Sequence, residues 1–336
     1  MSKKNKKKRG KKIMKVILII IVILAILMFI GFIINSILSK GELEQIEPYG
    51  KMINVDGKNI HVNSMGNGSE TIVLLPGFGV SLPSADFGPL MRELSKKYTV
   101  ATIEYFGVGF SDEIDTPRTN ENYTHEIRTA LQKAGFTPPY ILMPHSISGI
   151  NGEYYASRYP DEIKGLILLD TTSTSKEVLE SIPSYMNRLE NIGFSIGKFQ
   201  QKIGMTRLGM KLVPDTKLVK NGYTEKEISD YKKFSNHVIN NTIINQSLSK
   251  ANNIKETSSL DFPENIPVIK LISSETLKNM AKKNKDDGLS YHTEHLKRLG
   301  KNTSYKVIEA SHFMYQTKVS EISDITDEFI DTLEQQ

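Results

Sequence analysis

Residues 140–149, Tyr-Ile-Leu-Met-Pro-His-Ser-Ile-Ser-Gly, place a serine between an apolar run and the start of a helical pattern. The apolar run predicts a buried strand, and Ser146 lies at the junction of this strand with the helix. A serine at such a junction is exposed on a tight turn with helix-end N–H groups nearby, as a nucleophile requires. The small residue Ser148 suits the close approach of strand and helix, whereas Pro144 stands where a nucleophile turn usually has glycine. An ordinary helix N-cap is the alternative for Ser146.

A glycine-containing loop, Pro76-Gly77-Phe78-Gly79, follows the apolar run at residues 71–75. In an acyl-transfer enzyme, a loop at this place presents a backbone N–H to the developing oxyanion, and the residue after the nucleophile supplies a second one. We therefore expect the oxyanion donors to be the N–H groups of Phe78 and Ile147. The alternative is a simple glycine turn between a strand and a helix.

His312 follows the last apolar run of the chain, in Ile-Glu-Ala-Ser-His-Phe at residues 308–313. Among the seven histidines it alone follows a late predicted strand, from which it can reach back to Ser146. A neutral imidazole there takes the hydroxyl proton and later returns it to the leaving group, as a general base and acid. His145 adjoins the nucleophile in sequence, but its side chain is expected to point away from it and to have a structural role.

The segment Glu104–Asp112 contains Gly107 and Gly109 directly after a predicted strand. These glycines suit a tight turn near the site. A dinucleotide-binding loop is excluded, because the third glycine and the helix start of that motif are missing.

Apolar runs predict the elements that must position these residues. Residues 52–55 and 59–62 alternate around Asp56-Gly57, which predicts a hairpin. Further strands and helices alternate along the chain and predict a parallel sheet covered by helices on both faces. The strands are expected at residues 71–75, 98–103, 140–143, 164–169, 266–272 and 304–308, and the helices at 123–134, after residue 146 and at 319–333. Between about residues 174 and 262, Lys-, Asn- and Ser-rich amphipathic segments predict an inserted helical cap.

The order of the glycine loop, the Gly-x-Gly-x-Ser turn at residues 107–111, the His-Ser pair and the late His312 resembles the α/β-hydrolase superfamily over about residues 51–335. The single-domain hydrolases with a helical cap after the sixth strand are the most similar. This resemblance implies an α/β-hydrolase fold with a mostly parallel eight-stranded sheet, a Ser-His-acid triad and no cofactor. The sequence departs from the family pattern at Pro76, Glu104 and Pro144, where His, Asp and Gly are common.

The same resemblance implies that the triad acid follows the seventh strand, where this chain has Glu275. Glu275 comes about one position earlier than the usual Asp. Asp170, at the end of the preceding strand, is the alternative acid, because some superfamily members use that position. A third reading is that Asp170 only caps the loop leading into the cap. We therefore expect Glu275 to be the acid.

Composition and charge exclude several classes of protein and of site. A chain with 39% hydrophobic and 24% charged residues is not disordered, and the absence of cysteine excludes disulfides and a cysteine nucleophile. Nine of the 43 basic residues lie within the first 15, and the other 34 face 38 acidic residues, so no nucleic-acid partner is expected. His292 and His295 lie three apart without a third ligand nearby, so we expect both at the surface and no metal site.

The N-terminal region predicts a membrane anchor. A basic tail at residues 1–15 precedes residues 16–39, which carry no charge and are long enough to cross a hydrocarbon core of about 30 Å as a helix. A cleaved signal peptide is the alternative, but its apolar region is usually only about 7–15 residues long and ends at a small-residue cleavage site. The positive tail predicts a cytoplasmic N-terminus and a catalytic domain outside the cell membrane. Residues 40–50 are polar and contain Pro and Gly, so we expect a linker there.

Together these features predict a single-pass membrane serine hydrolase of the esterase or lipase kind. The expected partner besides the membrane is a small-molecule acyl substrate, such as a carboxylic ester or a lipid, which passes through an acyl-enzyme intermediate. A serine at position 146 disfavours dehalogenase chemistry, which uses Asp there. A peptidase of the same fold and a catalytically silent binding protein are the alternatives.

Overall fold

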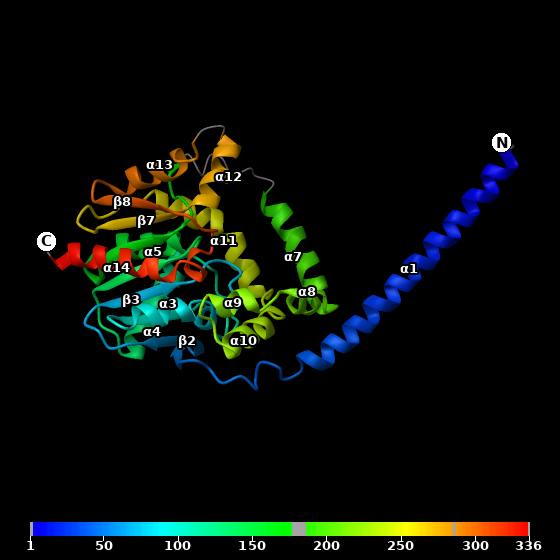
Figure 1. Ribbon diagram of the computed structural model, residues 1–336, viewed down its shortest axis with the longest axis horizontal. Coiled ribbons are helices and arrows are strands. Elements are labelled where there is room, and N and C mark those ends of the chain that lie inside the picture. The colour runs from blue at the N-terminus through cyan, green and yellow to red at the C-terminus, as the bar shows by residue number, and fades with distance from the viewer. Residues whose placement is uncertain (1–2, 177–185, 285–286, 335–336) are drawn as a thin grey trace.

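The computed structural model describes residues 3–176, 186–284 and 287–334. A long helix, α1 (Lys3–Ser39), extends away from a body in which helices cover a sheet (Figure 1). The first two residues of the expected tail, residues 177–185 of the expected cap and residue 335 lie outside the described residues.

The sheet has eight strands in the order β1-β2-β4-β3-β5-β6-β7-β8. Strand β2 pairs antiparallel with β1 and β4, and the other neighbours pair in parallel. The strands are β1 (Lys51–Val55), β2 (Lys58–Met65), β3 (Thr71–Leu75), β4 (Thr99–Glu104), β5 (Tyr140–Pro144), β6 (Ile163–Leu169), β7 (Val268–Ser273) and β8 (Thr303–Ile308). The predicted mostly parallel sheet is confirmed. Because β3, β5, β6, β7 and β8 run in the same direction, the loops after them meet at one edge.

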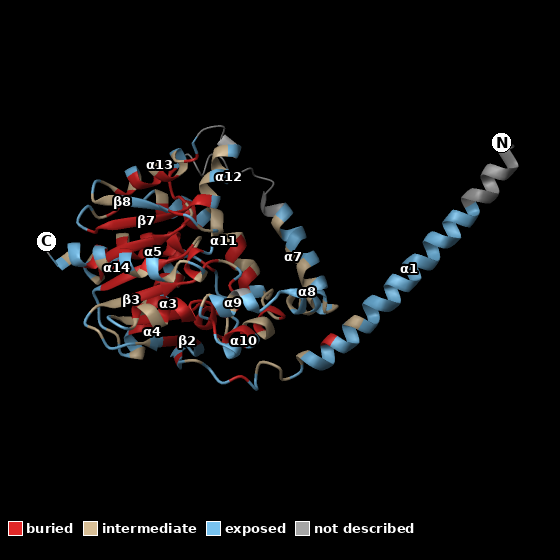
Figure 2. Cartoon of the chain, viewed as in Figure 1, coloured by how far each residue is buried: buried red, intermediate tan, exposed pale blue. Residues whose placement is uncertain are grey.

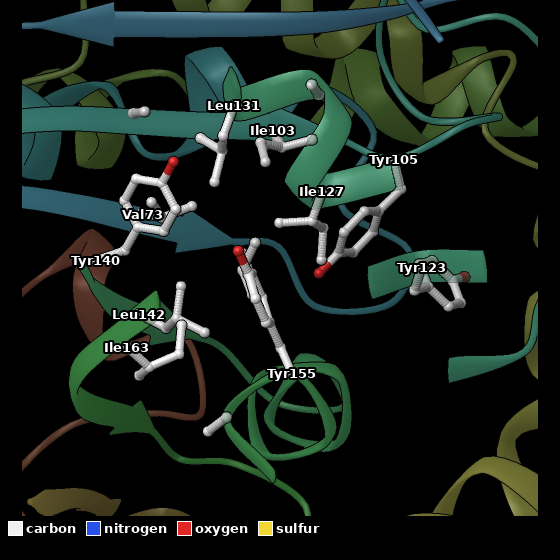
Figure 3. Close-up of a cluster of buried hydrophobic side chains, with 14 of the residues drawn as sticks. Val73, Ile103, Tyr105, Tyr123, Ile127, Leu131, Tyr140, Leu142, Tyr155 and Ile163 are labelled. Atoms are coloured by element: carbon white, nitrogen blue, oxygen red, sulfur yellow. The ribbon is translucent and has the colours of Figure 1, made fainter. Parts of the chain in front are cut away.

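Helices cover both faces of the sheet, as the alternation of apolar runs predicts. On one face, Ile127 and Leu131 of α4 pack with Val73 of β3, Ile103 of β4 and Tyr155 of α5 (Figure 3). On the other face, α3 and α14 supply most of the helical side chains of a second buried cluster. Removing a buried side chain as large as Leu131 costs about 2–5 kcal/mol. The helices are α2 (Pro83–Asp86), α3 (Gly88–Leu94), α4 (Asn120–Ala134), α5 (Ser148–Arg158) and α14 (Val319–Glu334).

The described residues between β6 and β7 form five helices, here called the cap. The cap helices are α7 (Met186–Lys202), α8 (Met205–Leu212), α9 (Thr216–Lys220), α10 (Glu225–Ser235) and α11 (Asn241–Ser258). The side chain of Thr224 accepts from the Glu227 N–H and the side chain of Glu227 accepts from the Thr224 N–H, which satisfies two end donors of α10. Two further helices, α12 (Ser274–Asn284) and α13 (Ser290–Leu299), connect β7 to β8.

Within the described chain, one stretch of helix is long and apolar enough to cross a membrane, Lys11–Ser39 of α1. Its apolar side chains are exposed rather than packed into the body (Figure 2). The length and composition of this stretch fit a membrane anchor and a signal sequence alike.

Candidate active site

Ser146 lies on a sharp turn between β5 and α5. Its φ angle is +56°, in the left-handed region that costs a non-glycine residue roughly 1–2 kcal/mol. The Ser146 N–H donates to Leu169 O at 3.0 Å and its C=O accepts from the Thr172 N–H at 3.0 Å, so the loop after β6 holds the strained turn. Helix α5 has Ile147 at its N-cap position, without a side-chain capping bond. The alternative that Ser146 is an ordinary N-cap is therefore wrong.

The side chain of His312 connects Ser146 to a carboxylate. His312 lies four residues after the end of β8, and its Nε2 is 2.9 Å from the Ser146 Oγ. Its Nδ1 is 2.6 Å from Oδ2 of Asp170. With Nδ1–H donating to the carboxylate, Nε2 is the acceptor for the serine hydroxyl. This arrangement allows the imidazole to accept the hydroxyl proton while the carboxylate fixes its tautomer.

Asp170 is held by three donors at the end of β6. Besides His312, its carboxylate accepts from the Thr276 hydroxyl at 2.6 Å and from the Ser273 N–H at 3.0 Å. Burial raises the pKa of Asp170, but these hydrogen bonds outweigh burial and lower the pKa below its ordinary value. The carboxylate therefore stays ionised near neutral pH.

The structure does not join Glu275 to His312, which corrects the preference for Glu275 as the acid. Strand β7 ends at Ser273 and α12 begins at Ser274, so Glu275 falls in the first helical turn and is exposed. The Nδ1 atom of His312 is already bound to Asp170. Of the two candidate carboxylates, the structure thus brings Asp170 to His312.

The glycine loop after β3 lies directly against Ser146. A Cβ atom added to Gly77 would be 3.1 Å from the Ser146 Cβ and 2.6 Å from the His145 Nδ1, so this approach requires glycine. Within the described part of the chain, no hydrogen-bond acceptor is found for the N–H groups of Phe78 and Ile147. Both N–H groups predicted as oxyanion donors therefore lack an acceptor within the described residues.

Comparison with known proteins agrees with this fold. The profile of the alpha/beta hydrolase fold family matches residues 70–192. The uncharacterized protein YbdG of Bacillus subtilis is 30% identical over 240 residues, which cover 71% of this chain and 73% of that protein. The chain belongs to the α/β-hydrolase fold family.

Two further comparisons involve one protein that is similar in part of its sequence and one that is similar in structure. The human (lyso)-N-acylphosphatidylethanolamine lipase is 31% identical over 114 residues, 33% of this chain and 33% of that protein. The crystal structure of the Cif epoxide hydrolase from Acinetobacter nosocomialis superposes with a TM-score of 0.63 at 14% identity, covering 90% of this chain and 96% of that one. The second likeness shows the fold alone.

Ser148 replaces a glycine of the usual α/β-hydrolase turn and adds a contact that glycine cannot make. Its buried hydroxyl donates to Pro76 O at 2.5 Å and accepts from the Tyr105 hydroxyl at 3.1 Å. The nucleophile turn is thereby bonded to the glycine loop that carries the Phe78 N–H. Sequence reasoning identified Ser148 only as a small residue.

The side chain of His145 contacts His312 rather than Ser146. Its ring lies 4.6 Å from the His312 ring, centroid to centroid, and its Nε2–H donates to His312 O at 3.1 Å. Burial and the nearby His312 charge lower the pKa of His145 to about 3. A neutral His145 is therefore a structural support of His312 in this α/β hydrolase.

His292 and His295 are fully buried on α13, so the expectation that both lie at the surface is wrong. The Nδ1 of His295 accepts from the buried Lys270 Nζ at 2.8 Å, and its Nε2–H donates to the buried Glu153 at 2.8 Å. Burial lowers the pKa of Lys270 to about 8. Sequence reasoning missed this network because Lys270 lies inside an apolar strand pattern and Glu153 inside a helix.

Proposed function

We propose that this α/β hydrolase cleaves a carboxylic ester, a lipid or a related acyl substrate, with Ser146 as nucleophile, His312 as general base and Asp170 as the orienting acid. One observation carries this proposal, the two hydrogen bonds that join Ser146 to His312 and His312 to Asp170. The strained φ at Ser146 and the two free N–H groups beside it support the same chemistry.

The proposed reaction proceeds in two halves. As the Ser146 Oγ attacks the acyl carbon, its proton passes to His312 Nε2, and the carbonyl oxygen becomes an oxyanion that accepts from the Phe78 and Ile147 N–H groups. The intermediate then expels the alcohol, which receives the proton from His312, and an ester to Ser146 is left. Water attacks this acyl-enzyme by the same sequence and releases the acid and the free serine.

Serine chemistry favours acyl substrates over epoxides. If the Ser146 hydroxyl opened an epoxide, it would form an ether, which has no carbonyl for water to attack. The enzyme would remain alkylated after one event. The likeness to an epoxide hydrolase is therefore a likeness of fold, whereas an acyl ester of Ser146 is released by the same oxyanion donors that helped to form it.

A lipid-like substrate, and a catalytic body outside the cell with α1 as its anchor, are further parts of the proposal. The ring of Phe194 on α7 lies 6.0 Å, centroid to centroid, from the ring of Phe78 in the glycine loop after β3, so an apolar side chain of the cap adjoins the site. The partial likeness to a phospholipid lipase supports the same substrate class. Protease treatment of intact cells tests the orientation, since full protection of the body would contradict it.

Labelling by a fluorophosphonate probe tests the serine mechanism. The nucleophile displaces fluoride from phosphorus, so the purified full-length chain is expected to be labelled and its Ser146→Ala variant is not. Ser259→Ala, which removes an exposed hydroxyl at the end of α11, is the matched control and keeps its labelling. A folded wild type that takes no label would favour a silent binding protein. Equal turnover of short water-soluble esters and of lipid esters would contradict the lipid-like substrate.

A further inference from the structure

The carboxyl-terminal part of α1 is bound to the cap. Gly31 lies so close to the α7–α8 turn that a Cβ atom at this position would be 2.6 Å from Ile203 O. One turn further on, Asn35 is buried, and its side-chain amide donates to Gln201 O at 3.0 Å and to Lys202 O at 3.3 Å. These two carbonyls belong to the last turn of α7, so the amide satisfies acceptors that a helix end leaves open.

Arg207 of α8 fixes the same junction from the other side. Its Nε donates to the Asn35 Oδ1 at 3.0 Å, and its two terminal nitrogens donate to both carboxylate oxygens of Glu42 at 2.6 and 2.8 Å. A terminal nitrogen also donates to the Ser39 hydroxyl at 3.1 Å. Such a paired, partly buried guanidinium contact is directional, so it sets the orientation of α8 relative to α1.

This junction places the cap at the level of the apolar run of α1. Gly31 lies inside the run of apolar residues from Val16 to Ile34, and no charged residue occurs before Lys40. If α1 crosses a bilayer, the α7–α8 turn that contacts Gly31 lies at or within the boundary of the hydrocarbon. Figure 1 shows α7 and α8 on the side of the body that faces α1.

The outer side of these two helices is apolar and exposed. On α7 the exposed residues recur at helical spacing, and each is between 50% and 54% exposed: Leu189, Ile192, Ile196 and Phe199. On α8 the exposed fractions are 52–77% for Met205, Leu208 and Leu212. We call these seven residues the apolar cap face. Figure 2 shows α7 and α8 largely exposed, in contrast to the buried sheet. Seven exposed apolar side chains on two adjoining helices are unfavourable in water, and such a gathering marks an interface.

We propose that the apolar cap face lies in the surface of the lipid bilayer that α1 crosses. The face is continuous with the membrane-spanning helix through the Gly31 and Arg207 contacts, which favours lipid over a protein partner. The exposed Lys202 and Lys211 flank it, and ammonium groups in this position reach lipid phosphates while their stems stay in the apolar layer. The inference rests on the proposed anchoring role of α1.

In this placement, one side of α7 contacts the lipid and the opposite side contacts the proposed active site. Its outer side contains Ile192, Ile196 and Phe199, whereas its inner side places Phe194 against Phe78 of the oxyanion loop. A single helix then separates the lipid phase from the nucleophile. A lipid substrate would reach Ser146 past α7 without crossing bulk water.

Depth measurement by tryptophan fluorescence tests the proposal, because the natural chain contains no tryptophan. Three single-tryptophan variants of the full-length chain are reconstituted into phosphatidylcholine vesicles with or without bromine on the acyl chains. Phe199→Trp reports on the apolar cap face, and Phe29→Trp reports on α1. Tyr159→Trp is the control, since Tyr159 is 38% exposed at the end of α5, next to the amino-terminal ends of the strands and away from the cap.

Brominated acyl chains are expected to quench the fluorescence of the Phe29→Trp and Phe199→Trp variants at least twofold and to leave that of Tyr159→Trp unchanged. Quenching in the Phe29→Trp variant without quenching in Phe199→Trp would overturn the proposal and leave the anchor intact. If neither variant were quenched, the anchor and the cap contact would both be wrong. Concentration-dependent cross-linking through the cap, with no quenching in Phe199→Trp, would overturn the proposal by showing that a second copy covers this face instead.

Discussion

The Nδ1 atom of His312 lies 2.6 Å from a carboxylate oxygen of Asp170, which directly follows the strand next to the one that leads into Ser146. Strands β5 and β6 pair in parallel, and the Ser146 N–H is bonded to Leu169 O, so Ser146 and Asp170 are held by adjacent backbone segments. The distance between them therefore depends on sheet geometry rather than on a mobile loop.

Asp170→Asn is expected to lower kcat by about 10³–10⁴, because an amide neither fixes the required imidazole tautomer nor stabilises the imidazolium. KM should change little, since Asp170 is buried and acts through its contact with His312. Hydrolysis of a 4-nitrophenyl ester by the purified full-length chain measures both constants.

Glu275→Gln is the matched control for this prediction. Glu275 is exposed in the first turn of α12, so the kcat of this variant is expected to stay within about twofold of the wild type. A large loss in Glu275→Gln together with a small one in Asp170→Asn would restore Glu275 as the acid.

The difference between these two carboxylates shows where sequence reasoning stops. The strands can be predicted because apolar runs such as residues 71–75 and 164–169 have no alternative to burial. Ser146 and His312 follow from their places at strand ends. The choice of acid depends instead on the left-handed φ of Asp170, +45°, and on donors from Ser273 and Thr276 more than 100 residues away. No local pattern encodes such contacts.

Buried polar side chains are a second feature of the structure that could not be predicted from the sequence. His292 and His295 lie three apart on one face of a helix and are expected at the surface, yet tertiary packing buries both. Lys270 inside β7 provides the partner for His295. Hydrophobic periodicity predicts which positions are apolar and buried. It contains no information on polar residues that become buried because a distant residue satisfies them.

Ser148→Ala is expected to reduce kcat about tenfold and to destabilise the fold by about 1–3 kcal/mol. The substitution removes the donor to Pro76 O and the acceptor of the Tyr105 hydroxyl, both in a buried site. Without this bond the loop that carries the Phe78 N–H is less well positioned toward the oxyanion. Steady-state kinetics and urea denaturation followed by circular dichroism measure the two effects.

Tyr105→Phe separates the two contributions. It removes the hydroxyl that donates to Ser148 but leaves the bond from Ser148 to Pro76 O in place. Stability should therefore fall by about 1 kcal/mol while kcat stays near the wild-type value. An equal loss of kcat in both variants would contradict a specific role of the Ser148 to Pro76 bond.

Asp86 is expected to make stability depend on pH. Burial raises its pKa to about 6, although Tyr315 and Gln316 donate to its carboxylate. The folded chain then binds a proton that the unfolded chain releases near pH 4, so this contribution to stability is lost as the pH rises from about 4 to about 6. The loss is at most about 3 kcal/mol, from about 2 pKa units. Asp86→Asn lacks this titration. The difference in urea midpoint between the wild type and Asp86→Asn should therefore change between about pH 4 and about pH 6 and stay constant from about pH 7 to about pH 8.

Gly31→Leu is expected to detach the cap from α1. A side chain at this position meets the backbone oxygen of Ile203, which cannot rotate away as a flexible side chain would, so α7 and α8 must shift. Amide hydrogen exchange in residues 186–212 should become roughly tenfold faster in lipid nanodiscs, because the junction that protects these helices is weakened. Ala25→Leu adds a side chain of the same size on an exposed part of α1 and should leave the exchange unchanged. Unchanged exchange in Gly31→Leu would show that the cap is held by the body alone, and that the contacts of Asn35 and Arg207 do not determine its position.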